Sequence, residues 1–306
     1  MPAPPRTTTA SLRALLERTI DYAGLFAPAS LDMRTSVDNY SRYRNHPQQW
    51  ALGRLVLPVA RLDEFMNAQE DAVSEPWHLS GIVSAAIASD LAAVDEFNRK
   101  ASGAVIDSVE VRACNLEEIE LIRIHRPAGA TVLYEITPER ADELLPILRS
   151  IGGCAKLRTG GVVAEAFPPV EHMAEFIACC AELGVPFKAT AGLHHPLRCM
   201  RPFTYEPDAP EGWMHGFLNL FTASAIAWCA VRSGNAVPRA ALATCLADTE
   251  RANWHFGEDA LTWSGDREPV RIDSDALRLT RSRLALSFGS CSFEEPMQDM
   301  CELDLL

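Results

Sequence analysis

The sequence has very little lysine. Of its 28 lysine and arginine residues only three are lysine, namely Lys100, Lys156 and Lys188, so 25 are arginine. Arginine stays charged at any accessible pH, whereas a buried lysine can lose its proton and become a nucleophile. Two of the three lysines stand at matching points of two similar segments, "CAKLRTGG" and "FKATAGLHHP". This placement predicts a role for Lys156 and Lys188 that arginine cannot fill.

Net positive charge, long apolar runs and paired cysteine motifs are also absent. A formal charge of -13 argues against nucleic acid and anionic membrane surfaces as partners, because both require basic patches. No run of about 18 apolar residues predicts a membrane span, and "MPAPPRTTTA" has no apolar core of the signal-peptide type. The nine cysteines show no CxxC spacing, so we expect reduced thiols and a cytoplasmic location.

What is present is a regular alternation of short apolar runs with amphipathic stretches. Each apolar run is rich in Val, Ile and Leu, and the stretches between them begin and end with residues typical of helix boundaries. Eight strands, each followed by a helix, predict a (β/α)8 TIM barrel, with an open doubly wound sheet as the alternative. The eight runs are residues 21–28, 53–59, 79–85, 105–111, 131–137, 154–160, 186–192 and 284–290.

The alternation breaks once, before the last strand. Residues 196–283 hold a polar loop, the apolar stretch "MHGFLNLFTASAIAWCAVRSG" and a second helical pattern. We interpret 1–306 as a single barrel domain in which 196–283 is a helical insertion. An insertion after a late barrel strand commonly caps the catalytic mouth or forms an oligomer interface, so the chain is a candidate homo-oligomer.

Charged residues recur at alternate positions of four consecutive predicted strands. Side chains alternate between the two faces of a strand, and both faces are buried in an α/β barrel. If the valine-rich face packs against helices, the charged face points into the barrel. Buried charges are costly unless paired, and clusters of them are typical of catalytic pockets, although an inert salt-bridge network is the alternative. The predicted cluster contains Glu110, Arg112, Glu135, Lys156, Arg158 and Lys188.

"KLRTGG", followed by "KATAGL" with its lysine 32 residues later, resembles the paired lysine motifs of deoxyribose-phosphate aldolases and related class I aldolases. The resemblance implies that Lys156 forms a Schiff base with a carbonyl substrate and that Lys188 lowers its pKa by charge repulsion. "VIDSVEV" resembles the family's fourth strand, whose acid would be Glu110 or Asp107 here, and "FGSCS" resembles its phosphate loop. Arg158 replaces a small residue of the family motif, and the long insertion has no counterpart there.

The residues themselves support the same chemistry. Lys156, Lys188 and Arg158 would place three cations close together, and a neighbouring cation lowers the pKa of a lysine enough to make it nucleophilic. Glu135 or Glu110 could carry protons to and from the reacting carbonyl. The alternative role for the same cations is to bind a carboxylate or a phosphate.

Glycine-rich strand ends supply further substrate-binding candidates. "RTGG" and "FGSCS" offer backbone amides to an anion, although the glycines also suit tight turns. Cys291 is interpreted as an ordinary buried thiol, and Asp21 is expected to lie away from the mouth of the barrel. The predicted substrate-binding residues are Arg112, Arg158, Thr159, Gly160, Thr190 and Ser290.

Three histidines allow a different hypothesis. His194 and His195 follow the seventh strand and His215 begins the apolar stretch, so with Cys291 they could form a metal site. However, adjacent residues of an extended chain point to opposite sides, and neither HxH nor HExxH spacing occurs. His194 is therefore predicted first as a general acid or base.

Together these observations predict a cytoplasmic lyase of the aldolase type that acts on a small anionic carbonyl compound without a cofactor. Its catalytic residues would be drawn from the two lysines, the two glutamates and the first histidine after strand seven. Two alternatives stay open. One is a metal-dependent hydrolase, lyase or isomerase built on the histidines, and the other is a non-catalytic barrel that binds a small anion.

Overall fold

Eight parallel strands close into a barrel. The computed structural model describes residues 8–69, 75–101, 103–112, 115–266 and 268–306. The strands pair in the closed order β1-β13-β7-β6-β5-β4-β3-β2, and all eight pairings are parallel. The predicted (β/α)8 barrel is confirmed. Its strands are β1 (Ile20–Tyr22), β2 (Leu52–Pro58), β3 (Trp77–Ile82), β4 (Ala104–Arg112), β5 (Thr131–Ile136), β6 (Cys154–Arg158), β7 (Phe187–Thr190) and β13 (Ala285–Ser290).

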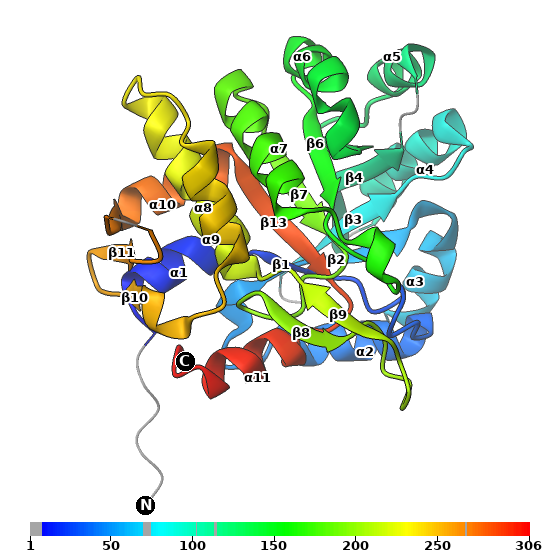
Figure 1. The fold of residues 1–306 in the computed structure, drawn as a ribbon. Helices are drawn as coiled ribbons and strands as arrows, with labels where there is room; N and C mark the ends of the chain where they lie inside the picture. The colour runs from blue at the N-terminus through cyan, green and yellow to red at the C-terminus, as the bar shows by residue number, and fades with distance from the viewer. Residues whose placement is uncertain (1–7, 70–74, 102, 113–114, 267) are drawn as a thin grey trace, which may run out of the picture.

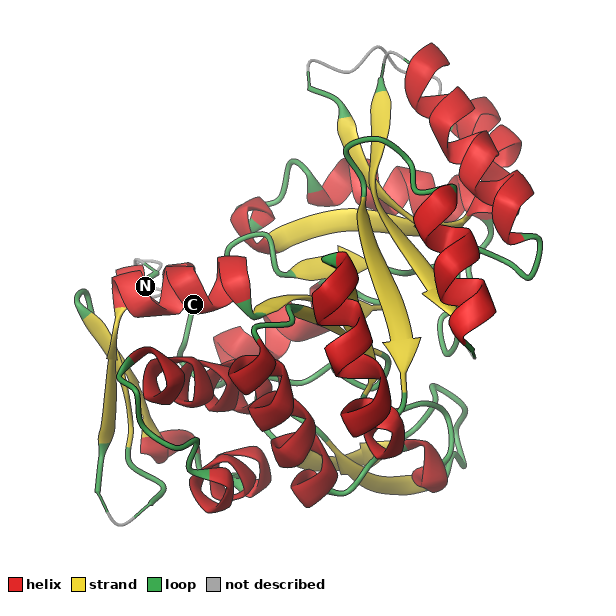
Figure 2. Ribbon diagram, turned by 90° about the horizontal axis from the view of Figure 1, so that it is seen from above, coloured by secondary structure: helices red, strands yellow, loops and turns green. Residues whose placement is uncertain are grey.

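Helices surround the strands, as Figures 1 and 2 show. Their ends follow local sequence signals: the Asp32 side chain accepts a hydrogen bond from the Thr35 amide at the start of α2, and α6 ends at Gly152 in the left-handed conformation. The helices between the first seven strands are α2 (Met33–Tyr43), α3 (Leu62–Ala68), α4 (Ile87–Lys100), α5 (Leu116–Ile124), α6 (Ala141–Ile151) and α7 (Val170–Leu183). At the ends of the chain, α1 (Ala10–Leu16) precedes β1 and α11 (Glu294–Glu302) follows β13.

The segment between β7 and β13 contains strands as well as the predicted helices. Helices α8 (Phe217–Arg232), α9 (Arg239–Ala247) and α10 (Ser274–Arg283) lie beside the barrel (Figure 1). A hairpin and a three-stranded antiparallel sheet accompany them, neither of which the sequence patterns indicated. The hairpin is β8 (Cys199–Pro202) and β9 (Glu211–Met214), and the sheet is β10 (Trp254–Phe256), β11 (Ala260–Trp263) and β12 (Val270–Asp273). No helix in the described ranges is both long and apolar enough to span a membrane.

The alternation of side chains separates an apolar layer from a charged interior. Leu157 and Ala189 point outward and are fully buried in the hydrophobic core between strands and helices. Lys156 and Lys188, which immediately precede them in the sequence, point inward. Lys156 of β6 stands opposite Lys188 of β7 and also opposite Glu135 of β5, so strand register alone brings these three side chains together.

Candidate active site

A cavity of about 680 Å³ opens at the carboxyl ends of the barrel strands. In (β/α)8 enzymes this end of the barrel carries the active site. The wall includes apolar residues from the first three strands and a polar side built by the later ones. Its polar and charged members include Glu110, Arg112, Glu135, Lys156, Arg158, Lys188, Thr190, His194 and Cys291.

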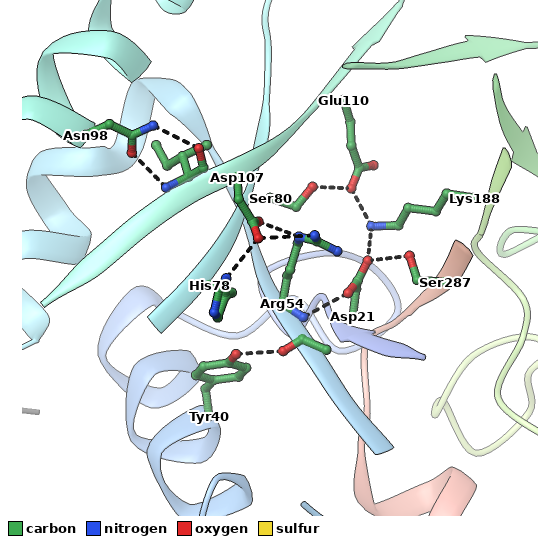
Figure 3. Close-up of polar contacts among 12 residues, drawn as sticks. Asp21, Tyr40, Arg54, His78, Ser80, Asn98, Asp107, Glu110, Lys188 and Ser287 are labelled. Carbon is green, nitrogen blue, oxygen red and sulfur yellow. Dashed lines mark hydrogen bonds and ion pairs between the residues drawn. The ribbon is translucent and has the colours of Figure 1, made fainter. Parts of the chain in front are cut away.

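Lys188 is the deepest cation of the cavity and lies between two carboxylates. Its Nζ donates to Oε1 of Glu110 at 2.6 Å and is 2.6 Å from Oδ2 of Asp21, while only 1% of its side chain is exposed. Figure 3 shows this arrangement, in which Ser287 also donates to Asp21. Burial alone would lower the pKa of Lys188, but the charges of Asp21 and Glu110 outweigh it and raise the pKa.

The idea that a neighbouring cation lowers the pKa of a lysine in this cluster does not hold for Lys188. Carboxylates separate the two ammonium groups, because Glu110 accepts from Lys188 with one oxygen and pairs with Lys156 through the other, at 2.8 Å. Opposite charges within hydrogen-bonding distance stabilise the protonated amine more than a second cation destabilises it. Lys188 is consequently an ammonium group at neutral pH.

Glu110 is the central anion of the network. Its side chain is 2% exposed, and Ser80 donates a hydrogen bond to its Oε1 at 2.8 Å. Burial on its own would raise the pKa of Glu110, but the charges of Lys156 and Lys188 hold it well below its usual range. Of the two candidates for the strand-four acid, Glu110 is the one that faces the cavity. Asp107 instead binds Arg54 and His78 (Figure 3).

Lys156 lies closer to the cavity entrance than Lys188. Its Nζ is 2.8 Å from Oε2 of Glu110 and 2.9 Å from Oε2 of Glu135. Burial alone would raise the pKa of Glu135, but Lys156 outweighs this and lowers it, so Glu135 is ionised at neutral pH. Lys156 thus has a proton acceptor on each side.

Two arginines stand at the rim beside Glu135. The Nε atoms of Arg112 and Arg158 are 3.5 Å and 3.7 Å from its Oε1, with 75% and 48% of the two side chains exposed. Both line the cavity. Long exposed ion pairs are weak, so the guanidinium groups can turn toward an incoming anion at little cost.

Asp21 is a member of the charge network that the sequence analysis did not include. It lies within β1, its side chain is 1% exposed, and its Oδ1 accepts a hydrogen bond from the backbone amide of Arg54 at 2.8 Å. In agreement with the expectation for its position, Asp21 is not among the residues found in the cavity wall, but it pairs with Lys188, which does line the cavity. One aspartate inside an otherwise apolar strand was the signal in the sequence.

The remaining predicted substrate-binding residues divide between the cavity wall and the packing around it. Thr190 lines the cavity. Thr159 is buried and donates to the Ala191 carbonyl at 2.6 Å, and Ser290 lies 3.4 Å from Nδ1 of His194. Gly160 packs so closely on Phe167 that an added Cβ would approach it to 2.5 Å. Thr159, Gly160 and Ser290 therefore support the strand ends and are not among the residues found in the cavity wall.

The three histidines do not converge on one point. His194 lines the cavity, whereas Nδ1 of His195 pairs with Asp299 at 2.5 Å and Nε2 of His215 donates to the Pro168 carbonyl at 2.9 Å. Within the part of the chain that the structure describes, no three His, Cys, Asp or Glu side chains form a metal-binding group. The histidine set proposed for a metal does not fit one.

His215 provides a pH test of the structure around the site. Burial lowers the pKa of its imidazole to about 4, and its Nδ1 has no hydrogen-bond partner among the described residues. The unfolded chain takes up a proton near pH 6.5, so the folded state loses stability as the pH falls from 6.5 to about 4, by about 3 kcal/mol. Denaturant unfolding at pH 7.5 and 4.5 should show that loss in the wild type and not in His215→Gln. Equal losses of unfolding free energy in the two proteins would contradict a neutral, buried imidazole at His215.

The comparisons with known proteins do not assign the chain to a family. Neither a family model nor a curated protein matches it. Among solved structures, that of a FabK mutant from Thermotoga maritima matches with a TM-score of 0.40 at 12% identity, covering 98% of this chain and 98% of that chain. A likeness at this level does not indicate an activity. The functional conclusion therefore rests on the chemistry of the site.

Proposed function

We propose that the protein is an enzyme that forms a Schiff base between Lys156 and a small anionic carbonyl compound and then breaks a carbon–carbon bond next to it. One observation carries the proposal. Lys156 borders the cavity with its Nζ within 2.9 Å of two carboxylates, and the outer of these, Glu135, also lies beside two exposed arginines. An amine, its proton acceptor and an anion-binding rim are thus contiguous.

The first half of the reaction is proton transfer and addition. An ammonium proton of Lys156 passes to Glu135, and the freed electron pair of Nζ attacks the carbonyl carbon of the substrate. The carbonyl oxygen takes up the proton from Glu135, which gives a carbinolamine with a protonated nitrogen. Arg112 and Arg158 hold the carboxylate or phosphate of the substrate at the rim during these steps.

The second half expels water and cleaves the carbon–carbon bond. The carbinolamine nitrogen returns one proton to Glu135, the hydroxyl group takes it, and water leaves, so an iminium ion remains on Lys156. The hydroxyl group on the neighbouring carbon of the substrate then gives its proton to Glu135 and becomes the carbonyl of the departing fragment. As the carbon–carbon bond breaks, its electron pair moves into the iminium group and forms an enamine, which takes up the proton from Glu135 at carbon and is released from Lys156 by water. Lys188 and Glu110 stay charged throughout and keep the inner wall at constant charge.

A second candidate function is a barrel that binds a small anion without turnover. The observation that favours it is the ion pairing of both lysines, which stabilises the ammonium form. In that case Lys156 and the rim arginines would act only as counter-ions to the ligand. The two functions differ in whether a covalent bond forms at Lys156.

Borohydride reduction separates the two functions. The protein is incubated with a panel of 2-oxo acids and phosphorylated aldehydes, reduced with borohydride, and analysed by peptide mass mapping. We expect a reduced adduct at Lys156 with at least one compound, and none at this position in Lys156→Met. Lys100 is an internal control, because its amine is exposed and paired with Glu96 on a helix surface.

The outcomes are distinct. Reduced adducts confined to Lys100 or the N-terminal amine, across the whole panel, would contradict the Schiff-base proposal. Saturable binding of a panel compound without any adduct, together with unchanged ligand after long incubation, would favour the anion-binding barrel.

A further inference from the structure

A second nucleophilic group lies in the wall of the same cavity. Cys291 follows β13, lines the cavity, and places its Sγ 4.0 Å from Nδ1 of His194. The same nitrogen of His194 is 3.3 Å from Oε2 of Glu295. His194 therefore stands between a thiol and a carboxylate, which is an arrangement that stabilises an imidazolium ion next to a thiolate.

The groups around the thiol come from several parts of the fold. Oη of Tyr205, from the loop between β8 and β9, is 3.7 Å from Sγ of Cys291 and donates to Glu295 at 3.1 Å. Tyr22 of β1 also interacts electrostatically with the thiol, and the backbone amide of Ala29 donates a hydrogen bond to the sulfur. The insertion thus supplies one member of this cluster, Tyr205.

The electrostatics agree with this geometry. Burial alone would lower the pKa of His194, but Cys291 and Glu295 outweigh it and raise the pKa to about 9. Burial alone would raise the pKa of Cys291, but His194 outweighs it and the pKa is lowered. Elsewhere in the described chain burial raises the pKa of six other thiols, those of Cys154, Cys179, Cys180, Cys199, Cys229 and Cys245.

We propose that Cys291 is a second nucleophile of the cavity, paired with His194, and that its thiolate adds reversibly to small anionic aldehydes that enter there. The rim arginines Arg112 and Arg158 lie on the wall of the same cavity as Cys291. This inference goes beyond the proposed function, because it holds whether or not Lys156 forms an imine. It also replaces the interpretation of Cys291 as an inert buried thiol.

The addition step balances without an oxidant or a further reactant. The Sγ electron pair forms a bond to the aldehyde carbon, and the carbonyl π electrons move to oxygen. That oxygen takes the Nδ1 proton of His194, which leaves a neutral hemithioacetal and a neutral imidazole. Reversal returns the proton to His194 and releases the aldehyde.

The ligand test uses glyoxylate labelled with ¹³C at the aldehyde carbon and detected by NMR. We expect a hemithioacetal carbon signal with the wild-type protein, its loss in Cys291→Ser, and its retention in Cys301→Ser. Cys301 is the matched control because its thiol is exposed, so ordinary thiol addition would depend on it instead. An imine carbon gives a separate signal, so failure at Lys156 and failure at Cys291 are distinguished in one spectrum.

The reactivity test compares the wild-type protein with His194→Gln. The rate of Cys291 alkylation by iodoacetamide, followed by peptide mass mapping, should rise less than tenfold between pH 6.5 and 8.5. An ordinary thiol of pKa 8.5 would show a rise of about fiftyfold over this interval. His194→Gln should restore the steep dependence. A steep rise in the wild type, or a hemithioacetal signal that is absent or that persists in Cys291→Ser, would overturn the proposal.

Discussion

Replacement of Lys188 by methionine is expected to lower the free energy of unfolding by about 3–5 kcal/mol. The variant keeps the volume of the side chain but removes the ammonium group that lies 2.6 Å from both Asp21 and Glu110. Asp21 is then a buried carboxylate that has lost its direct ion pair, and a buried charge without a hydrogen-bonded counter-ion is costly. Urea unfolding at pH 7.5, with the wild type as reference, measures the change.

Two further variants identify the cause of that loss. Lys100→Met removes an exposed ion pair with Glu96 and should change the free energy of unfolding by no more than about 0.5 kcal/mol. Asp21→Asn, introduced into the Lys188→Met protein, should recover part of the stability, because the buried negative charge disappears. The amide oxygen can still accept from the backbone amide of Arg54, and the amide NH2 group can donate to the Ser287 hydroxyl. If the free energy of unfolding of Lys188→Met equalled that of Lys100→Met, the ion pairs of Lys188 would not contribute to the stability of the barrel.

Replacement of Glu135 by glutamine is expected to lower the rate of borohydride-trapped adduct formation at Lys156 by about 100-fold or more. The amide oxygen can still accept a hydrogen bond from the lysine, but it cannot take up the ammonium proton that must leave before Nζ attacks. The measurement is the initial rate of adduct formation with the panel compound that labels the wild type best.

Glu96→Gln is the matched control for this variant. Glu96 is the partner of the exposed lysine, so the same chemical change at the surface should leave the trapping rate at Lys156 unaltered. A Glu135→Gln rate within a factor of about three of the wild type would contradict the role of Glu135 as the proton acceptor, since general bases typically contribute 100-fold or more. Glu110 would then be the remaining carboxylate in contact with Lys156.

The insertion illustrates where patterns in the sequence stop being informative. Its helices were predicted from their length and apolar composition, but its five strands are only three or four residues long. So short a strand contains at most two alternations of side-chain direction, which is too few to distinguish from a loop. Tyr205 enters the site from the loop of such a hairpin, and its contacts with Cys291 and Glu295 join segments more than 80 residues apart.

The charge state of the lysines was also beyond prediction from sequence. The alternation of side chains placed Lys156 and Lys188 on one face, and the structure agrees. A second ammonium group lowers the pKa of a lysine, whereas carboxylates close to it raise the pKa. Which effect is larger depends on the groups that lie between the two nitrogens. Here Glu110 lies between the two nitrogens, and Asp21 of the first strand also pairs with Lys188.

The sequence by itself determined the barrel, the position of the seven strands after the first and the inward face that carries the charges, because strand period and helix boundaries are local properties of the chain. The first strand was predicted over residues 21–28 and is Ile20–Tyr22 in the structure. Only the tertiary structure decided the pairing of those charges, the inclusion of Asp21, and the contact between Cys291 and His194. Each of these depends on distances of 2.6–4.0 Å between residues remote in sequence. Electrostatic interactions change steeply over such distances, so the chemistry of the site is set when the barrel closes.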